Sequence, residues 1–447
     1  MSLRFGTDGV RGLAGAELSP ELVMTLGRAA ARVLGSGTFV VGRDTRASGP
    51  MLQAALSAGL AAEGADVVDL GVIPTPGVAA VAAGRAVAAA VISASHNPYH
   101  DNGVKLLAPG GLKLTDDQEQ RVEAEMSVLA ASQLGKSAPP ARIGSLVADH
   151  HALGWYCEHV VEALGGRKLG GLKVVLDCAN GAASATAERI VAGAGADVVE
   201  VLANTPDGFN LNSGSGSTDP SLLAGAVRAS GADVGLAFDG DADRVIAVDE
   251  HGDVVDGDRL LALFAVDLKN RGRLAGDTLV ATVMSNLGLE KAMAAAGIRV
   301  HRTPVGDRNV LEALDANGWS LGGEQSGHII FRDVATTGDG VLSGLMLLDL
   351  VSRSGRRLSQ LAGEAMVSLP QVQLNVEVPP GSRAVSSPRV TEAVRSVEAE
   401  LGSGGRVVLR ASGTEPLVRV MVEAGTEAVA QAAARRLVDA VRHAAGE

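Results

Sequence analysis

The chain has 447 residues, 46% hydrophobic and 20% charged, which predicts a folded protein of about two to four domains. A net charge of -12 argues against a general binder of nucleic acids or anionic membranes, and 2% aromatic residues argue against base stacking. Two cysteines, Cys157 and Cys178, are too few for a disulfide framework or a zinc site, and no apolar signal core or membrane-length apolar stretch stands out. We therefore expect a cytoplasmic protein.

Three segments share one predicted order of elements: strand, polar loop, helix, glycine and strand. They cover residues 39–70, 172–202 and 278–303. Short Val-rich strands that alternate with helices indicate βαβ units. A recurring unit predicts three related α/β domains.

The end of the chain has a different pattern. A strand near residues 369–381 is followed by elements that we expect at 388–401 (helix), 406–411 and 417–424 (strands) and 426–444 (helix). This order predicts a smaller α+β domain. The expected domains are 1–150, 151–253, 254–368 and 369–447.

The first chemical motif is VISASHNPYHDNGVK, residues 91–105. An apolar strand ends there in small polar residues, and Pro98 blocks its simple continuation. Ser95 would then lie at the tip of a strand, where α/β folds place their active sites. A serine can act as a nucleophile or phosphate carrier when a neighbour activates it, and His96 and Lys105 are candidates. Taken alone, the stretch is equally compatible with a plain polar loop.

The second motif is FDGDADR, residues 238–244. Asp239, Asp241 and Asp243 alternate along the chain, and alternate side chains of extended chain share one side. Three converging carboxylates repel one another unless a hard cation such as Mg²⁺ neutralises them. The spacing partly resembles an EF-hand loop, but the apparent strand RVIAVD follows at once and excludes that interpretation. Arg244 adds a cation beside the predicted metal.

The third motif is LRASGTEPLVRV, a tight polar loop between two strands with an arginine on each side. Backbone N–H groups, hydroxyls and guanidinium groups suit a phosphate dianion. An ordinary hairpin turn would not need both arginines. The sequence has no Walker A or GxGxxG pattern that would indicate a nucleotide. The residues concerned are Arg410, Ser412, Gly413, Thr414 and Arg419.

Two further glycine-flanked loops are weaker signals. In LGGEQSGHII (321–330), Glu324 and Ser326 could hydrogen-bond sugar hydroxyls, although a solvated turn is the first interpretation of the stretch taken alone. In RFGTDGVRG (4–12), Arg11 could reach a phosphate, and a simple N-terminal turn is the alternative.

Together these motifs resemble the α-D-phosphohexomutase superfamily, in the order of that family and over nearly the whole chain. The opening FGTDGVRG together with GEQSGH is similar to the phosphoglucosamine mutase branch rather than the phosphomannomutase/phosphoglucomutase branch. Ser215, Asp219 and Asn309 depart from residues that are common in relatives, and none of them is assigned to chemistry. The motifs that carry the resemblance are ASHNP (94–98), DGDADR (239–244), GEQSGH (323–328) and RASGTEPLVRV (410–420).

The resemblance implies an α/β fold with four domains around a central cleft. It also implies that Ser95 is a phosphoserine and that one Mg²⁺ per active site is bound by the three aspartates and a phosphate oxygen on Ser95. Arg11 and Lys105 would face the transferring phosphoryl group. Glu324 and Ser326 would hold the sugar, and the arginine-flanked loop would hold the non-reacting phosphate. A homodimer is a further implication, although no stretch of the sequence marks an interface.

The implied reaction interconverts glucosamine 6-phosphate and glucosamine 1-phosphate through a hexosamine 1,6-bisphosphate, with a sugar 1,6-bisphosphate as activator. It would feed the synthesis of UDP-N-acetylglucosamine and the cell wall. The same mechanism on mannose or glucose phosphate is the alternative that lies nearest to it. A catalytically silent relative with a binding or regulatory role would be favoured if Ser95, an aspartate of the metal loop or an arginine of the phosphate loop were missing, and all of them are present. A plain phosphatase would leave the sugar and phosphate loops without a joint purpose.

Overall fold

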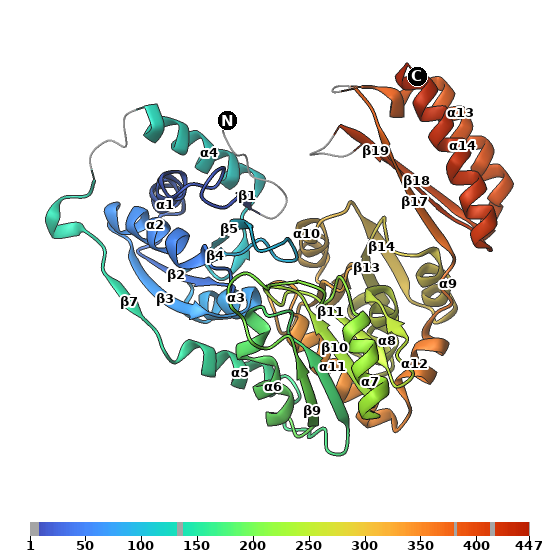
Figure 1. Cartoon of the computed structure of the whole chain (residues 1–447), viewed down its shortest axis with the longest axis horizontal. Coiled ribbons are helices and arrows are strands. Elements are labelled where there is room, and N and C mark those ends of the chain that lie inside the picture. Colours follow the sequence, from blue (N-terminus) through green and yellow to red (C-terminus); the bar gives the residue numbers. More distant parts are fainter. Residues whose placement is uncertain (1–8, 132–136, 380–381, 412–415, 447) are drawn as a thin grey trace.

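The computed structural model describes residues 9–131, 137–379, 382–411 and 416–446, which form four domains in chain order (Figure 1). Each of the first three contains a sheet with helices on both sides, and the fourth is a three-stranded sheet packed on two helices. The predicted fold class is therefore confirmed. In the described part of the chain, no helix is both long enough and apolar enough to cross a membrane.

The first domain is built on a sheet of order β1-β5-β4-β2-β3-β7, with β6 paired to β5. Side chains of β2 alternate between two hydrophobic clusters: Phe39 and Val41 pack with residues of α1 and α2, and Val40 packs with residues of α3. This alternation is the period of a strand that is buried on both faces. The elements are β1 (Val10–Leu13), α1 (Pro20–Leu34), β2 (Thr38–Arg43), α2 (Gly49–Ala62), β3 (Asp66–Val72), α3 (Thr75–Arg85), β4 (Ala88–Ile92), β5 (Asp101–Ala108), β6 (Leu112–Lys113), α4 (Asp116–Ala131) and β7 (Leu146–Ala148).

The second domain has the strand order β12-β11-β10-β8-β9. Strands β8, β9 and β10 run parallel, and β11 returns antiparallel to β10 through a short turn. Strands β10 and β11 are buried along their whole length, so the turn that joins them lies inside the protein. The elements are α5 (Ala152–Glu162), β8 (Lys173–Asp177), α6 (Ala187–Gly193), β9 (Asp197–Leu202), α7 (Ser221–Ser230), β10 (Val234–Phe238), β11 (Val245–Asp249) and β12 (Val254–Val255).

The third domain has the strand order β14-β13-β15-β16, in which the last pair is antiparallel. Helix α11 is almost completely buried, because it packs between the sheets of the second and third domains. The elements are α8 (Gly257–Asn270), β13 (Thr278–Thr282), α9 (Leu287–Ala295), β14 (Arg299–Thr303), α10 (Asp307–Asn317), β15 (Leu321–Gly323), β16 (Ile329–Phe331), α11 (Gly340–Ser354) and α12 (Leu358–Ala365).

The fourth domain is an antiparallel sheet of order β17-β19-β18, and its two long helices cover one face (Figure 1). The helices predicted at 388–401 and 426–444 and the strands predicted at 406–411 and 417–424 are present, with ends that differ by a residue at most. The elements are β17 (Gln371–Glu377), α13 (Pro388–Leu401), β18 (Arg406–Ala411), β19 (Leu417–Glu423) and α14 (Glu427–Ala445).

The repeat read from the sequence is also present. The pairs β2–β3, β8–β9 and β13–β14 are parallel, and a helix connects the strands of each pair. One hydrophobic cluster runs continuously from the first domain through the second into the third, whereas the fourth domain has a cluster of its own. The first three domains therefore form a joined body, and the fourth is a separate packing unit.

Candidate active site

Ser95 lies just beyond β4, at the strand tip where the sequence predicts it. Strand β4 is buried on both faces, so the chain is still inside the protein when it reaches the serine, which is 1% exposed. The backbone of Ser95 has a φ of +52°, an uncommon conformation for a residue with a side chain. Its hydroxyl donates to Oδ2 of Asp239 at 2.5 Å. The serine loop of the first domain thus meets the acidic loop of the second.

The three aspartates converge in the turn between β10 and β11. One oxygen of each lies within 4.8 Å of the others, and all three side chains are buried. The sequence argument assumed extended chain, but Ala242 at φ +57° makes this a tight turn. The turn, and not the pleat of a strand, brings the carboxylates together. Gly240 is required, because a Cβ there would lie 2.6 Å from the carbonyl oxygen of Ser95.

This cluster suits a hard dication. Oδ1 of Asp241 and Oδ1 of Asp243 are buried and accept no hydrogen bond within the described part of the chain. Buried oxygens without a partner cost free energy unless something neutralises them, and carboxylate oxygens are the ligands that Mg²⁺ prefers. Burial, with the charges of the other two aspartates, holds the pKa of Asp239 well above its usual range. The residues present therefore fit the metal ion that this site would hold.

Lys105 forms ion pairs with two aspartates of the triad. Its ammonium lies 2.8 Å from Oδ2 of Asp241 and 3.3 Å from Oδ2 of Asp243. Burial alone would raise the pKa of Asp243, but Lys105, His328 and Arg244 together hold it well below its usual range. Lys105 projects from β5, which is paired with β4, so adjacent strands of one sheet deliver the lysine and the serine.

His96 lies beside Ser95, and Arg11 and Arg244 lie close enough to its ring to act on it electrostatically. Nδ1 of His96 is 3.4 Å from the Ser95 hydroxyl oxygen. Burial, followed by the positive charges of Arg244 and Arg11, lowers the pKa of His96 to about 4, so its ring is neutral at pH 7. The backbone N–H of Arg244 donates to Asp239 at 3.2 Å. Positive charge from Arg11 and Arg244 therefore acts on His96, close to the acidic cluster that the serine contacts.

The predicted sugar loop lies directly beside the acidic loop. The backbone N–H of Val245 donates to the carbonyl of Gly327, and the ring of buried His328 lies 3.8 Å from Asp243. Glu324 is half-buried and accepts the N–H of Gly306 at 3.1 Å, while Ser326 is exposed. Both side chains named in the sequence analysis thus stand on a loop whose far end touches the acidic triad.

The predicted phosphate loop lies on the fourth domain. Arg410 on β18 and Arg419 on β19 are cross-strand partners in the antiparallel ladder. Burial and the positive charge of the neighbouring Arg419 lower the pKa of Arg410. Ser412, Gly413 and Thr414 lie outside the described residues. Figure 1 shows β18 and β19 apart from β4 and β5, so the structure does not bring this pair to the serine.

The sequence analysis missed several residues that complete the site. Thr75, the first residue of α3, donates its hydroxyl to Asp241 at 2.6 Å and its N–H to the Asp241 carbonyl at 3.0 Å. Lys113 of the first domain forms an ion pair with Asp307 of the third. These contacts join positions more than one hundred residues apart, so no local motif could have signalled them.

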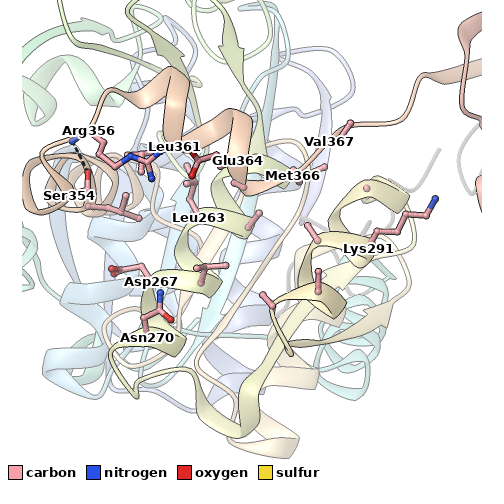
Figure 2. A pocket seen from close by; sticks show the side chains of 18 of the residues that line it. Leu263, Asp267, Asn270, Lys291, Ser354, Arg356, Leu361, Glu364, Met366 and Val367 are labelled. Carbon is pink, nitrogen blue, oxygen red and sulfur yellow. Dashed lines mark hydrogen bonds and ion pairs between the residues drawn. The ribbon is translucent and has the colours of Figure 1, made fainter.

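A large, mostly apolar groove lies elsewhere on the protein. It has a volume of about 910 Å³ and runs between α8, α9 and α12 of the third domain (Figure 2). Small apolar side chains such as Ala292 and Ala365 line it, with charged residues such as Lys291 and Asp267 at its sides. None of the candidate site residues in the preceding paragraphs lines this groove, so its size does not make it the active site.

Family models match all four domains in order. The models of phosphoglucomutase/phosphomannomutase alpha/beta/alpha domains I, II and III match residues 2–131, 155–252 and 256–369, and the C-terminal domain of the same family matches residues 374–441. With this fold and site, the protein is a mutase, an enzyme of the phosphohexomutase superfamily. Members of this superfamily use a metal ion, which agrees with the acidic triad.

Individual proteins narrow the assignment. The phosphoglucosamine mutase of Frankia alni is 52% identical over 99% of both chains. A phosphoglucomutase/phosphomannomutase family protein of Burkholderia thailandensis has a similar structure, with a TM-score of 0.81, 27% identity and coverage of 98% and 97% of the two chains. The N-acetylphosphoglucosamine mutase of Aspergillus fumigatus, solved with GlcNAc-6P and magnesium, shares the fold at a TM-score of 0.73 and 19% identity, over 100% and 96% of the chains. The chain belongs to the phosphoglucosamine mutases.

Proposed function

We propose that the protein interconverts glucosamine 6-phosphate and glucosamine 1-phosphate, with Ser95 as the phosphoryl carrier. One observation carries the proposal: the buried Ser95 hydroxyl donates to one carboxylate of a three-aspartate cluster, beside the sugar loop. Identity of about half the residues with phosphoglucosamine mutases along the whole chain supports the amino sugar as substrate.

In the first half of the reaction, the free hydroxyl oxygen of the sugar phosphate forms a bond to the phosphorus carried by Ser95. The bond from phosphorus to the serine oxygen breaks, and the hydroxyl proton is transferred, in the net balance, to that serine oxygen. The product is a hexosamine 1,6-bisphosphate. In the second half, after the intermediate has turned, Ser95 accepts the other phosphoryl group. His96 lies close enough to the serine oxygen to take part in the proton transfer.

The chain's own residues provide position and charge, which are what phosphoryl transfer mainly requires. Asp239, Asp241 and Asp243 would hold Mg²⁺, with a phosphate oxygen on Ser95 as a further ligand. When bound, this ion supplies neutralisation of the charge on the transferring group. Lys105, Arg11 and Arg244 add positive charge around the same oxygen atoms. The four domains would carry these roles over residues 1–150, 151–253, 254–368 and 369–447.

Substrate orientation is assigned to the two remaining loops. Glu324 and Ser326 would accept and donate hydrogen bonds to sugar hydroxyls. Arg410 and Arg419, with the intervening loop, would bind the phosphate that does not react, since two guanidinium groups on one sheet face match a dianion. Because the bisphosphate must present either end to Ser95, this second site has to accept both of its phosphates.

The remaining expectations belong to the same proposal. A sugar 1,6-bisphosphate would activate the enzyme by phosphorylating Ser95. The reaction would take place in the cytoplasm and supply precursors of UDP-N-acetylglucosamine and peptidoglycan. A homodimer stays a prediction.

The test is a turnover assay with Mg²⁺ and a trace of glucose 1,6-bisphosphate, in which glucosamine 6-phosphate, glucose 6-phosphate and mannose 6-phosphate are compared. We expect the highest kcat/KM for the amino sugar. A preference for a neutral hexose would retain the mechanism but reject the proposed substrate. Release of inorganic phosphate without isomerised product would reject the mutase mechanism itself.

A further inference from the structure

Arg46 follows β2 in the polar run RDTR, which the sequence suggests is an ordinary loop. The structure buries its side chain completely, with 0% exposed, and places it under the serine loop. A buried arginine is uncommon unless its charge and its donors are satisfied. The partners of this side chain therefore reveal its role.

The guanidinium of Arg46 has five N–H donors, and all of them are used. Nε donates to Oδ2 of Asp44 at 2.9 Å. The other four N–H groups donate to backbone carbonyls of a single segment, the serine loop. These carbonyls belong to Ser95 (2.9 Å), Asn97 (2.8 Å), Pro98 and Asp101 (2.9 Å).

A second set of bonds reaches the serine from the other side. Asp44 accepts the hydroxyl of Ser93 at 2.7 Å, and the Ser93 oxygen accepts the backbone N–H of Ser95 at 2.9 Å. The N–H and the C=O of Ser95 are thus both tied, directly or through one side chain, to the Asp44–Arg46 pair.

The conformation that these bonds enforce is strained. A residue with a side chain in the left-handed region costs about 1–2 kcal/mol and persists where its surroundings over-determine it. Ser95 is in this region, and its hydroxyl oxygen lies 2.5 Å from Asp239. If the loop relaxed, the hydroxyl would leave the acidic cluster, because its direction is set by the backbone that carries it.

We propose that Arg46 is a positioning residue for phosphoryl transfer, which holds Ser95 in the left-handed conformation that aims its oxygen at the acidic cluster. It acts through the backbone of the serine loop and does not touch the substrate. The inference rests on the proposed role of Ser95 as carrier, and it explains why an arginine is needed here. A lysine keeps the charge next to Asp44, but its three donors on a flexible stem cannot reach four carbonyls in a fixed fork.

The test compares Arg46→Lys with Arg28→Lys. Arg28 is a matched control, because it is also buried, pairs with Glu63 and belongs to the first domain. Its ion pair with Glu63 joins α1 to the end of α2. Three quantities are measured for each variant: the thermal unfolding midpoint, kcat and KM for glucosamine 6-phosphate, and backbone amide hydrogen exchange of residues 93–101 by mass spectrometry.

We expect Arg46→Lys to exchange amides of residues 93–101 faster than wild type and than Arg28→Lys. Its kcat should fall by about 100-fold or more, since a misplacement of about 1 Å at a reacting group has this effect, while KM changes much less. If exchange in this segment and kcat match those of Arg28→Lys, the role of Arg46 is only structural and the proposal is wrong. Wild-type protein without mutase activity would reject the proposed function, and the exchange comparison would still decide the role of Arg46.

Ser93→Ala gives an independent measurement if Arg46→Lys does not fold. It removes the bond to the Ser95 N–H and leaves every carbonyl bond of Arg46 in place. Faster exchange of the loop, with reduced kcat and a nearly unchanged KM, supports the proposal. Wild-type exchange and kcat in this variant would show that the bonds through Asp44 and Ser93 do not hold Ser95, and this part of the proposal would be wrong.

Discussion

The ion pair between Lys105 and the aspartates provides a sharp test of the acidic cluster as a metal site. The lysine ammonium and the three carboxylates are almost fully buried, and its distances to Asp241 and Asp243 are 2.8 and 3.3 Å. At an effective dielectric constant of about 20, these distances correspond to attractions of about 6 and about 5 kcal/mol before the cost of desolvation. Removal of one partner from a buried pair typically destabilises a protein by about 3–5 kcal/mol.

Lys105→Met should therefore lower the free energy of unfolding by about 3–5 kcal/mol when divalent cations are removed with a chelator. Excess Mg²⁺ should restore more than half of this loss, because the ion neutralises the same carboxylates and binds only the folded protein. Denaturant unfolding of both proteins, with chelator and with Mg²⁺, measures the four free energies. Lys269→Met is the control, since its ammonium pairs with Asp277 at 3.8 Å near the surface and should cost less than about 1 kcal/mol under either condition. An equal deficit of Lys105→Met with and without Mg²⁺ would refute the argument that the lysine and a metal share these carboxylates.

Three other variants test other parts of the site and fold. Ser95→Ala should show no turnover, and intact-protein mass spectrometry should detect no phosphorylation by glucose 1,6-bisphosphate. Its thermal unfolding midpoint should be nearly unchanged. Near-normal turnover would remove Ser95 from the mechanism. Arg419→Ala should lower kcat/KM by about 30-fold, which corresponds to about 2 kcal/mol for a lost charge-assisted hydrogen bond. The control Arg435→Ala, at an exposed position, should leave kcat/KM unchanged. Equal kinetics of the two variants would refute the phosphate site. Burial raises the pKa of Asp258 to about 7. The folded protein therefore retains a proton that the unfolded chain loses near pH 4. Because of this group, the free energy of unfolding of the wild type should fall by up to about 4 kcal/mol between pH 4 and 7. Asp258→Asn should remove this part of the pH dependence of denaturant unfolding, and an unchanged profile would contradict the assignment.

Local patterns in the sequence predict most of the fold and the chemical motifs. The strand that precedes Ser95 and the strand pair around the aspartates are short apolar runs that end in polar residues, and such boundaries are set by local chemistry. The convergence of the aspartates was predicted from an extended chain, whereas Ala242 produces it through a turn. Positive φ at an alanine has no signature in a single sequence.

The rest of the site depends on how the domains pack. The contact of Thr75 with Asp241 joins the first domain to the second, and the ion pair of Lys113 with Asp307 joins the first to the third. Arg46 shows the same limit within one domain, because a polar run after a strand predicts a solvated loop. Its burial follows only when residues 95–101 fold back over it.

The arrangement of the four domains suggests how an acidic protein could bind an intermediate that carries a phosphate at each end. The serine, the acidic cluster and the sugar loop belong to three domains that share one hydrophobic cluster and are further joined by buried bonds such as Tyr156 to Asp339. The arginine pair belongs to the fourth domain, which has its own core. Its ties to the third domain include the bonds of Glu423 to the N–H of Leu287 and of Arg406 to the carbonyl of Ser285, close to one another at the start of α9.

Phosphoryl transfer in both directions requires that the serine oxygen stay fixed, because a misplacement of about 1 Å at a reacting atom lowers the rate strongly. The site for the non-reacting phosphate, in contrast, has to fit either end of the intermediate. Rotation about the contacts at the start of α9 would move Arg410 and Arg419 and leave the bonds around Ser95 intact. In the proposed mechanism, Lys105 and the acidic cluster would stay fixed in one packing unit, while Arg410 and Arg419 in the other would adjust to either end of the bisphosphate.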